Sequence, residues 1–228
     1  RTRELGEIIR ETLAKPYMLA GREFHCAASL GATLFFGEKE SVETLLKHAD
    51  LAMYKAKSAG RDTLRFFDPA MQVALDERSG LEADLRLAME AGQLRLYYQP
   101  QVDNARRLIG AEALLRWEHP QHGMVMPGRF IYLAEETSLI LQIGEWVLTT
   151  ACAQIKAWST VPATRDLKLA VNVSARQFRQ HGFVDQVKSI LTRAEANPLN
   201  LKIELTESVV LDDVDAVNVV EAHLAYLD

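Results

Sequence analysis

An alternating stretch near the middle of the chain, residues 109–118, constrains the fold more than any other part of the sequence. In an extended strand, successive side chains point to opposite faces, so its residues divide into two sets. One set is apolar (Ile109, Ala111, Ala113, Leu115, Trp117) and the other is mostly charged (Glu112, Leu114, Arg116, Glu118). The apolar residues are more than an exposed edge strand needs, so we expect the charged face to point into a site.

Two later segments alternate in the same way, and each places one misfit polar side chain opposite its apolar residues. In residues 167–174 this side chain is Asn172, and in residues 201–206 it is Glu204, beside Thr206. Where parallel strands alternate with helices, the carboxyl ends of the strands carry the chemistry. We therefore expect Glu112, Asn172 and Glu204 to gather near one end of a sheet.

Composition is that of a globular protein with one or two domains: 228 residues, 48% hydrophobic and 25% charged. A net charge of −5 argues against a nucleic-acid polymer as partner but allows a small phosphate ligand. There is no export signal and no apolar run of about 18 residues, so we expect a cytoplasmic location, with any membrane segment outside this chain. Cys26 and Cys152 have apolar neighbours, which favours two buried thiols over a disulfide.

Helical spacing and turn residues predict the elements of the first 92 residues. Helices are expected over 4–14, ended by Pro16, over 41–60, capped by Ser41, and over 70–92, interrupted at Ser79-Gly80. Residues 17–36 are expected to form a strand hairpin with its turn at 20–22, and residues 63–67 a short strand.

From Leu94 onward the pattern changes to strands separated by helices. Strands are expected at 94–102, 109–118, 167–174 and 201–206, with a loop at 119–127. Helices are expected at 128–140, 144–158, 183–194 and 214–227. Connections of this kind predict right-handed crossovers and a parallel sheet with both faces covered.

The run from Ala28 to Gly31, followed by residues 49–62 (ADLAMYKAKSAGRD), resembles the C-terminal part of a GGDEF domain, the diguanylate cyclase family. The resemblance implies that Lys57 and Arg61 contact the phosphates of GTP, and their spacing of four would place them on one helix face. Without it, they would be a solvated basic helix end. The motif that names the family is absent from this chain, so we expect that this segment alone cannot cyclise GTP. Asp62 stands where Asn is more usual.

Four later motifs resemble the first half of an EAL domain, the cyclic di-GMP phosphodiesterase family: Tyr98-Gln99-Pro100, Glu112-Ala113-Leu114, Asn172-Val173-Ser174 and Glu204-Leu205-Thr206-Glu207-Ser208. The likeness runs from about Leu81 to Asp228. It implies that Glu112, Asn172 and Glu204 bind divalent metal, with Glu112 also catalytic. It further implies that Gln99, Arg116 and the backbone of Leu114 contact the cyclic dinucleotide, and that Glu207 steadies a catalytic loop. Tyr132 and Ser138 replace a frequent Pro and Gly.

The residue chemistry agrees with the resemblance, although each side chain also has a purely structural reading. Two carboxylates and an amide oxygen suit Mg²⁺ or Mn²⁺, and the ion would activate water for attack on a phosphodiester. Alternatively, Asn172 and Glu204 are polar interior residues that are simply hydrogen-bonded, and Arg116 forms a salt bridge to Glu118 or another carboxylate. His119 and His122 lie in a loop without a third nitrogen ligand, so we expect surface histidines rather than a metal pair.

The predicted fold is α/β: the C-terminal remnant of an α+β GGDEF domain (1–69), a linker helix (70–92) and the N-terminal half of an EAL (β/α)₈ barrel (93–228). Because a full barrel needs about 250 residues, and the family's later aspartates, lysine and glutamate would follow Asp228, we expect this polypeptide alone to be inactive. The complete protein is expected to hydrolyse cyclic di-GMP to linear pGpG. A half barrel exposes apolar surface, so we expect a fragment or a homodimer.

Two other functions are compatible with parts of this pattern. A degenerate GGDEF–EAL pair could bind the nucleotide, or GTP, as a receptor that regulates a partner; the family's downstream residues would discriminate the two. An unrelated metal-dependent barrel enzyme, such as an enolase-type isomerase, would not explain four motifs at family-like spacing.

Overall fold

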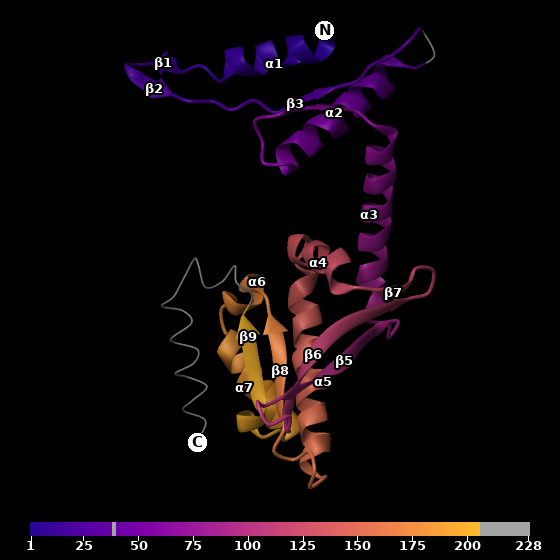
Figure 1. Cartoon of the computed structure of the whole chain (residues 1–228), viewed down its shortest axis with the longest axis vertical. Helices are drawn as coiled ribbons and strands as arrows, with labels where there is room; N and C mark the ends of the chain where they lie inside the picture. Colours follow the sequence, from indigo (N-terminus) through magenta and orange to yellow (C-terminus); the bar gives the residue numbers. More distant parts are fainter. Residues whose placement is uncertain (38–39, 206–228) are drawn as a thin grey trace. The chain divides into compact units, whose positions relative to one another are not determined.

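A computed structural model describes residues 1–37 and 40–205, and the chain divides into two compact units, residues 1–80 and 81–228 (Figure 1). Within the described residues, no helix is long and apolar enough to span a membrane. The helix predicted over 214–227 lies outside the described residues.

The first unit consists of helices and two small sheets. Its elements are α1 (Thr2–Leu13), β1 (Tyr17–Leu19), β2 (Arg22–Phe24), β3 (Leu30–Ala32), α2 (Val42–Ser58), β4 (Leu64–Phe66) and the start of α3 (Pro69–Ala88). β1 pairs antiparallel with β2, as the predicted hairpin requires, whereas β3 pairs in parallel with β4. The predicted hairpin over 17–36 therefore forms only over residues 17–24, because residues 30–32 pair with β4 in a separate sheet.

Helix α2 begins as predicted, since Ser41 caps it and accepts a hydrogen bond from the backbone N–H of Thr44 at 3.1 Å. Gly31 lets β3 lie close against this helix: a Cβ atom at that position would come within 2.0 Å of the carbonyl oxygen of Ala49. Helix α3 runs through Ser79-Gly80 without a break, because one glycine costs only about 1 kcal/mol among good helix formers. Cys26 is exposed and not buried as predicted.

The second unit contains one sheet with strand order β5-β6-β8-β9, and β7 also pairs with β6. Its elements are β5 (Leu94–Val102), β6 (Leu108–His119), β7 (Gly123–Val125), the 3-10 turn η1 (Pro127–Arg129), α4 (Ile131–Thr137), α5 (Leu139–Ser159), β8 (Lys168–Val173), α6 (Ala175–Phe178), α7 (Phe183–Ala194), the 3-10 turn η2 (Pro198–Asn200) and β9 (Leu201–Leu205). β6, β8 and β9 are parallel, whereas β5 and β7 are antiparallel to β6.

Three features of this unit differ from the predicted ones. A turn near Asn104 joins β5 and β6, as expected, and they pair antiparallel, so the sheet is mixed and not wholly parallel as predicted. Residues 123–125 of the predicted loop form β7. The helices expected at 128–140 and 144–158 are α4 and α5, which divide at Ser138, whose φ of 67° is left-handed and interrupts the helix.

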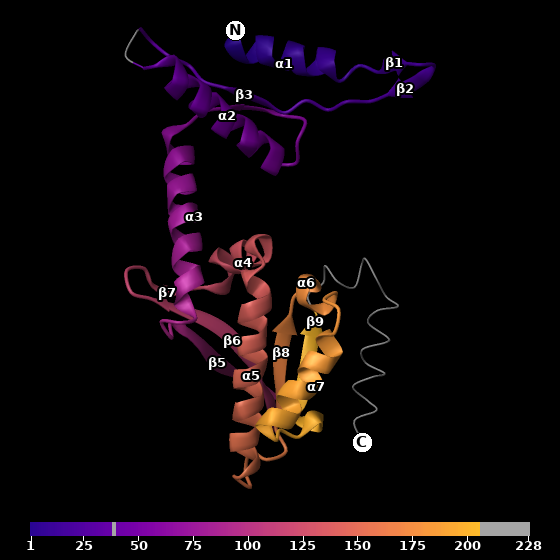
Figure 2. The same ribbon diagram turned by 180° about the vertical axis from the view of Figure 1, so that it is seen from behind.

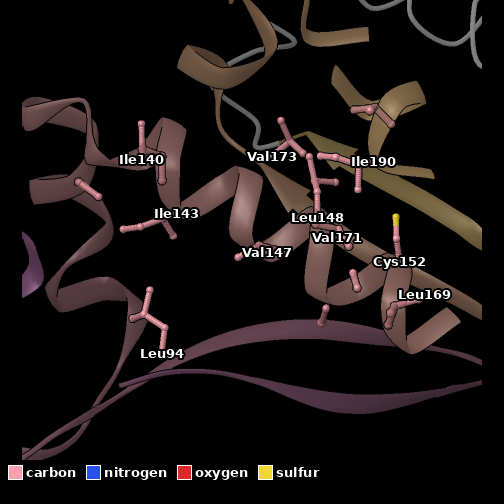
Figure 3. Packing of buried hydrophobic residues seen from close by; sticks show 14 of the residues in the cluster. Leu94, Ile140, Ile143, Val147, Leu148, Cys152, Leu169, Val171, Val173 and Ile190 are labelled. Carbon is pink, nitrogen blue, oxygen red and sulfur yellow. The ribbon is translucent and has the colours of Figure 1, made fainter. Parts of the chain in front are cut away.

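The core lies between one face of the sheet and the long helix α5, with α7 beside it (Figures 2 and 3). β8 contributes three fully buried side chains (Leu169, Val171, Val173), and α5 contributes several, among them Ile143, Leu148 and Cys152. The opposite face is not covered within the described residues, since Gln99, Asn172 and Lys202 are exposed there. The expectation that helices cover both faces was therefore wrong for this part of the chain.

Close approach between β6 and β8 depends on a glycine at the start of their pairing. Gly110 lies opposite Lys168, and a Cβ atom on Gly110 would come within 2.3 Å of the Lys168 carbonyl oxygen. Gly110 therefore lets β6 and β8 pair in register.

Candidate functional site

The uncovered face of the sheet holds the polar side chains that the alternation predicted. Glu112 lies opposite Gln99 on β5 and opposite Ala170 on β8. Asn172 lies two residues beyond Ala170 and directly opposite Glu204 on β9. Because side chains two residues apart share a face, Glu112, Asn172 and Glu204 lie on one side of three neighbouring parallel strands.

Hydrogen bonds link these side chains across the sheet. The amide Nδ2 of Asn172 donates to Oε1 of Glu112 over 2.7 Å, which joins β8 to β6. This orientation leaves the carbonyl oxygen Oδ1 of Asn172 available as an acceptor. Glu204 is paired along its own strand, with its Oε1 2.7 Å from the Nζ of Lys202.

The donor chemistry of this face fits a divalent cation. Two carboxylates and one amide oxygen are hard oxygen ligands of the kind that Mg²⁺ and Mn²⁺ prefer. Within residues 1–37 and 40–205, no cluster of three His, Cys, Asp or Glu side chains could hold a metal. The amide oxygen of Asn172 is a further hard oxygen donor beside the two carboxylates on this face.

Leu114, Arg116 and Gln99 lie on the same face as Glu112. Leu114 pairs with Tyr97, and Arg116 pairs with Arg95. The guanidinium of Arg116 donates to the carbonyl of Leu115 at 2.8 Å. Glu118 forms its ion pair with Arg95 at 3.2 Å, so the predicted Arg116–Glu118 salt bridge is not formed.

The loop that follows Asn172 is held by a capping box at the start of α6. The side chain of Ser174 accepts from the backbone N–H of Gln177, and Oε1 of Gln177 accepts from the backbone N–H and the hydroxyl of Ser174. Both residues are buried. A cavity of about 230 Å³ adjoins this loop and is lined by Leu114, Asn172, Ser174 and apolar side chains of α4 and α5.

His119, at the end of β6, is buried with 4% of its surface exposed, so the prediction of a surface histidine was wrong. Its Nδ1 accepts from the backbone N–H groups of Gln121 and His122, and its Nε2 lies 3.1 Å from Oδ2 of Asp84 on α3. Because Nδ1 is an acceptor, Nε2 carries the proton and donates to Asp84. Trp117 lies on the opposite face of β6 from Arg116. It is also fully buried, and its Nε1 donates to Oε1 of Gln93.

The two cations predicted to act together in the first unit do not share a helix face. Helix α2 ends at Ser58, Gly60 has a φ of +100° and Arg61 has a φ of 63°, so Arg61 lies beyond the helix that carries Lys57. The prediction that Lys57 and Arg61 share a helix face was therefore wrong, because the helix ends before Arg61, with Gly60 in a left-handed conformation. Asp62 forms an ion pair with Arg10 at 3.0 Å. Glu207 lies outside the described residues.

Two family models match the chain. A model described as "EAL domain" matches residues 82–227, and one described as "Diguanylate cyclase, GGDEF domain" matches residues 1–63.

Curated relatives from Pseudomonas aeruginosa match nearly all of the chain. The protein named "Bifunctional diguanylate cyclase/cyclic di-GMP phosphodiesterase MucR" is 44% identical over 213 residues, which are 93% of this chain and 31% of that protein. "Cyclic di-GMP phosphodiesterase NbdA" is 34% identical over 212 residues, or 92% of this chain and 27% of that protein. The chain thus spans about a third or less of the length of these relatives.

Solved structures superpose on large parts of this chain. "PaMucR Phosphodiesterase, c-di-GMP complex" superposes with a TM-score of 0.61 at 49% identity, over 64% of this chain and 59% of that one. The EAL enzyme Bd1971, in a form bound to cAMP and cyclic di-GMP, superposes with a TM-score of 0.61 at 29% identity, over 81% of this chain and 49% of that one.

Proposed function

The chain belongs to the EAL domain family, and we propose that the whole protein hydrolyses cyclic di-GMP to linear pGpG at the polar face of the sheet formed by β5, β6, β8 and β9. One observation carries this proposal: Glu112, Asn172 and Glu204 lie on one face of three adjacent parallel strands, with Asn172 bonded to Glu112. The chain is the C-terminal remnant of a GGDEF domain followed by the first half of an EAL barrel.

Glu112, Asn172 and Glu204 would hold a divalent cation, Mg²⁺ or Mn²⁺. When bound, such an ion offsets the negative charge that develops on phosphate oxygens and makes water a better nucleophile near neutral pH. The hydrogen bond from Asn172 Nδ2 fixes the amide so that its oxygen, and not its nitrogen, is available on this face. Glu207 is proposed to steady the loop beside this site.

Arg116, the backbone of Leu114 and Gln99 are proposed to bind the cyclic dinucleotide. A guanidinium binds phosphate oxygens through charge-assisted hydrogen bonds. Arg116 makes no ion pair with any described carboxylate and has one backbone acceptor, so its remaining N–H donors can reach a ligand phosphate. Gln99 lies opposite Glu112 and is exposed, which suits contact with the substrate beside the metal ligands.

In the first unit, Lys57 and Arg61 are proposed contacts for phosphates of GTP in a complete GGDEF domain. They would act from the end of α2 and from the turn after it, since they do not share a helix face. Residues 70–92 are proposed as the connector between the two domains, and a homodimer as the assembled form.

The test is conversion of cyclic di-GMP to linear pGpG by the whole protein with Mn²⁺. Glu112→Gln should lower kcat by more than about 100-fold, because even outer-shell partners of a metal cost 10–100-fold when removed. Glu118→Gln is the matched control, since Glu118 shares the strand and the face but is paired to Arg95. Binding of cyclic di-GMP without turnover would contradict the proposed hydrolysis and identify a receptor. Absence of both binding and turnover would contradict the proposal altogether.

A further inference from the structure

Lys202 forms an ion pair with Glu204, one of the carboxylates of the proposed metal site. Its Nζ lies 2.7 Å from Oε1 of Glu204, two residues further along β9, so both side chains project from the same face of the strand. Ala170 lies directly opposite Lys202 on β8, and its methyl group is too small to hold the lysine against Glu204.

The two acids of the site are therefore held in different ways. Glu112 accepts an uncharged amide donor from Asn172, and this bond uses the amide nitrogen and leaves the amide oxygen free for a cation. Glu204 faces an ammonium group at Oε1, and a divalent cation bound to either oxygen of this carboxylate would repel that ammonium at close range. Binding at Glu204 thus favours departure of Lys202, whereas binding at Glu112 displaces no cation.

The ion pair is of a kind that can be displaced. The side chain of Lys202 is 56% exposed and that of Glu204 is 29% exposed. Exposed pairs are worth about 0.2–1 kcal/mol, so the lysine leaves Glu204 for a substantial fraction of the time. An ion that also engages Glu112 and Asn172 has more favourable contacts than the single ammonium.

We propose that Lys202 is a built-in counter-ion of Glu204, which holds that carboxylate in the absence of metal and is displaced when a divalent cation binds; this inference rests on the metal site proposed above. Lys202 is a positioning residue in this scheme, because it acts on the ion through Glu204. Lys202 weakens the apparent metal affinity, because only the fraction of molecules in which Glu204 is unpaired is ready to bind the ion. It also prevents an unpaired charge beside Asn172 when no ion is present.

The experiment measures Mn²⁺ binding to the chain by electron paramagnetic resonance of the unbound ion. Lys202→Met should bind Mn²⁺ about two- to sixfold more tightly than the unsubstituted chain, which is the factor expected from a pair of this strength. Lys168→Met is the matched control: Lys168 is an exposed lysine on the same face, at the start of the neighbouring strand, and it makes no ion pair with any described residue. Its affinity should be unchanged. Glu204→Gln should lose most of the binding.

A second measurement follows Lys202 itself. Acetylation of surface amines by acetic anhydride, read residue by residue by mass spectrometry, should increase about two- to sixfold at Lys202 when Mn²⁺ saturates the site, while Lys168 stays constant. This readout does not depend on turnover.

The outcomes separate the inference from the proposed function. If Mn²⁺ binds through Glu204 but Lys202→Met and Lys168→Met have equal affinities, or Lys202 labelling does not respond to bound Mn²⁺, the counter-ion role is overturned and the metal site stands. If Mn²⁺ binds to none of the variants, the metal site itself fails and the inference with it. Tighter binding by Lys202→Met alone, together with increased labelling, supports both.

Discussion

The thiol of Cys152 is fully buried on α5, and this burial changes its acid–base behaviour. Loss of water around the sulfur disfavours the thiolate and raises the pKa of Cys152 from 9.0 to about 11. Between these values the unfolded chain has lost a proton that the folded chain keeps. The folded state is therefore favoured below pH 9 and loses about 1.4 kcal/mol per pH unit from this group between pH 9 and 11.

This gives a prediction for alkaline pH. From pH 8 to pH 10 the unsubstituted chain should lose about 1 kcal/mol more unfolding free energy than Cys152→Ala. Urea titration followed by tryptophan fluorescence measures this difference, since Trp117, Trp146 and Trp158 all lie in the second unit. Cys26→Ala is the control, because Cys26 is exposed. Equal losses in all three proteins would contradict the burial effect.

His119 makes a second prediction at the scale of one side chain. His119→Phe keeps a ring of similar size but removes the acceptor for the N–H groups of Gln121 and His122 and the donor to Asp84. A hydrogen bond contributes about 0.5–1.5 kcal/mol net, so loss of these bonds should lower the unfolding free energy. His181→Phe, at an exposed position, should change it by less than about 0.5 kcal/mol. A neutral effect of His119→Phe would show that these hydrogen bonds are replaced by water.

Pairing between β6 and β8 depends on Gly110, and this makes a prediction for the sheet. In Gly110→Ala the new methyl group would meet a backbone oxygen of Lys168 at 2.3 Å, and backbone cannot turn away as a side chain can. Separating the strands should cost about 1–3 kcal/mol, the range for overpacking. Gly128→Ala is the control, since a Cβ atom there meets nothing within 4 Å. Hydrogen exchange of the β8 amides should accelerate only in Gly110→Ala.

Elements with strong local signals could be predicted from the sequence. The predicted strand 94–102 and helix 183–194 have the observed bounds, and Ser41 caps α2 as expected. The errors have two causes, distant pairing partners and local left-handed backbone positions. β7 exists because it pairs with the end of β6, and the left-handed backbone of Ser138 separates two helices whose apolar spacing continues through it. Lys57 and Arg61 do not share a helix face, because α2 ends at Ser58 and Gly60 has a left-handed φ.

The candidate site shows the same division between local and distant information. Alternation alone placed Glu112, Asn172 and Glu204 on the polar faces of their strands, because a period of two needs no knowledge of partners. Their register, the Asn172–Glu112 bond and the pairing of Lys202 with Glu204 required the structure. Lys202 could have been noticed in the sequence, since it shares the parity of Glu204, but a lysine at a strand start is an ordinary surface residue.

At the scale of the whole molecule, an ion held by Glu112, Asn172 and Glu204 would connect β6, β8 and β9, so its effect should be confined to the second unit. A ligand that binds only the folded state stabilises it by about 2.7 kcal/mol at 100 times its Kd. Mn²⁺ at that excess should therefore slow hydrogen exchange in peptides from β6, β8 and β9. Peptides from residues 1–80, which form a separate compact unit, should exchange at unchanged rates.

Glu204→Gln provides the control for this prediction, because it removes one charged ligand and leaves the strand and its register in place. In that variant, Mn²⁺ at the same concentration should give little or no protection of β6, β8 and β9 from hydrogen exchange. Protection spread evenly over both units would mean that the ion binds elsewhere or acts on the chain non-specifically. Protection limited to β8 and β9 would mean that Glu112 on β6 is not a ligand. The ion would then join only Asn172 on β8 and Glu204 on β9.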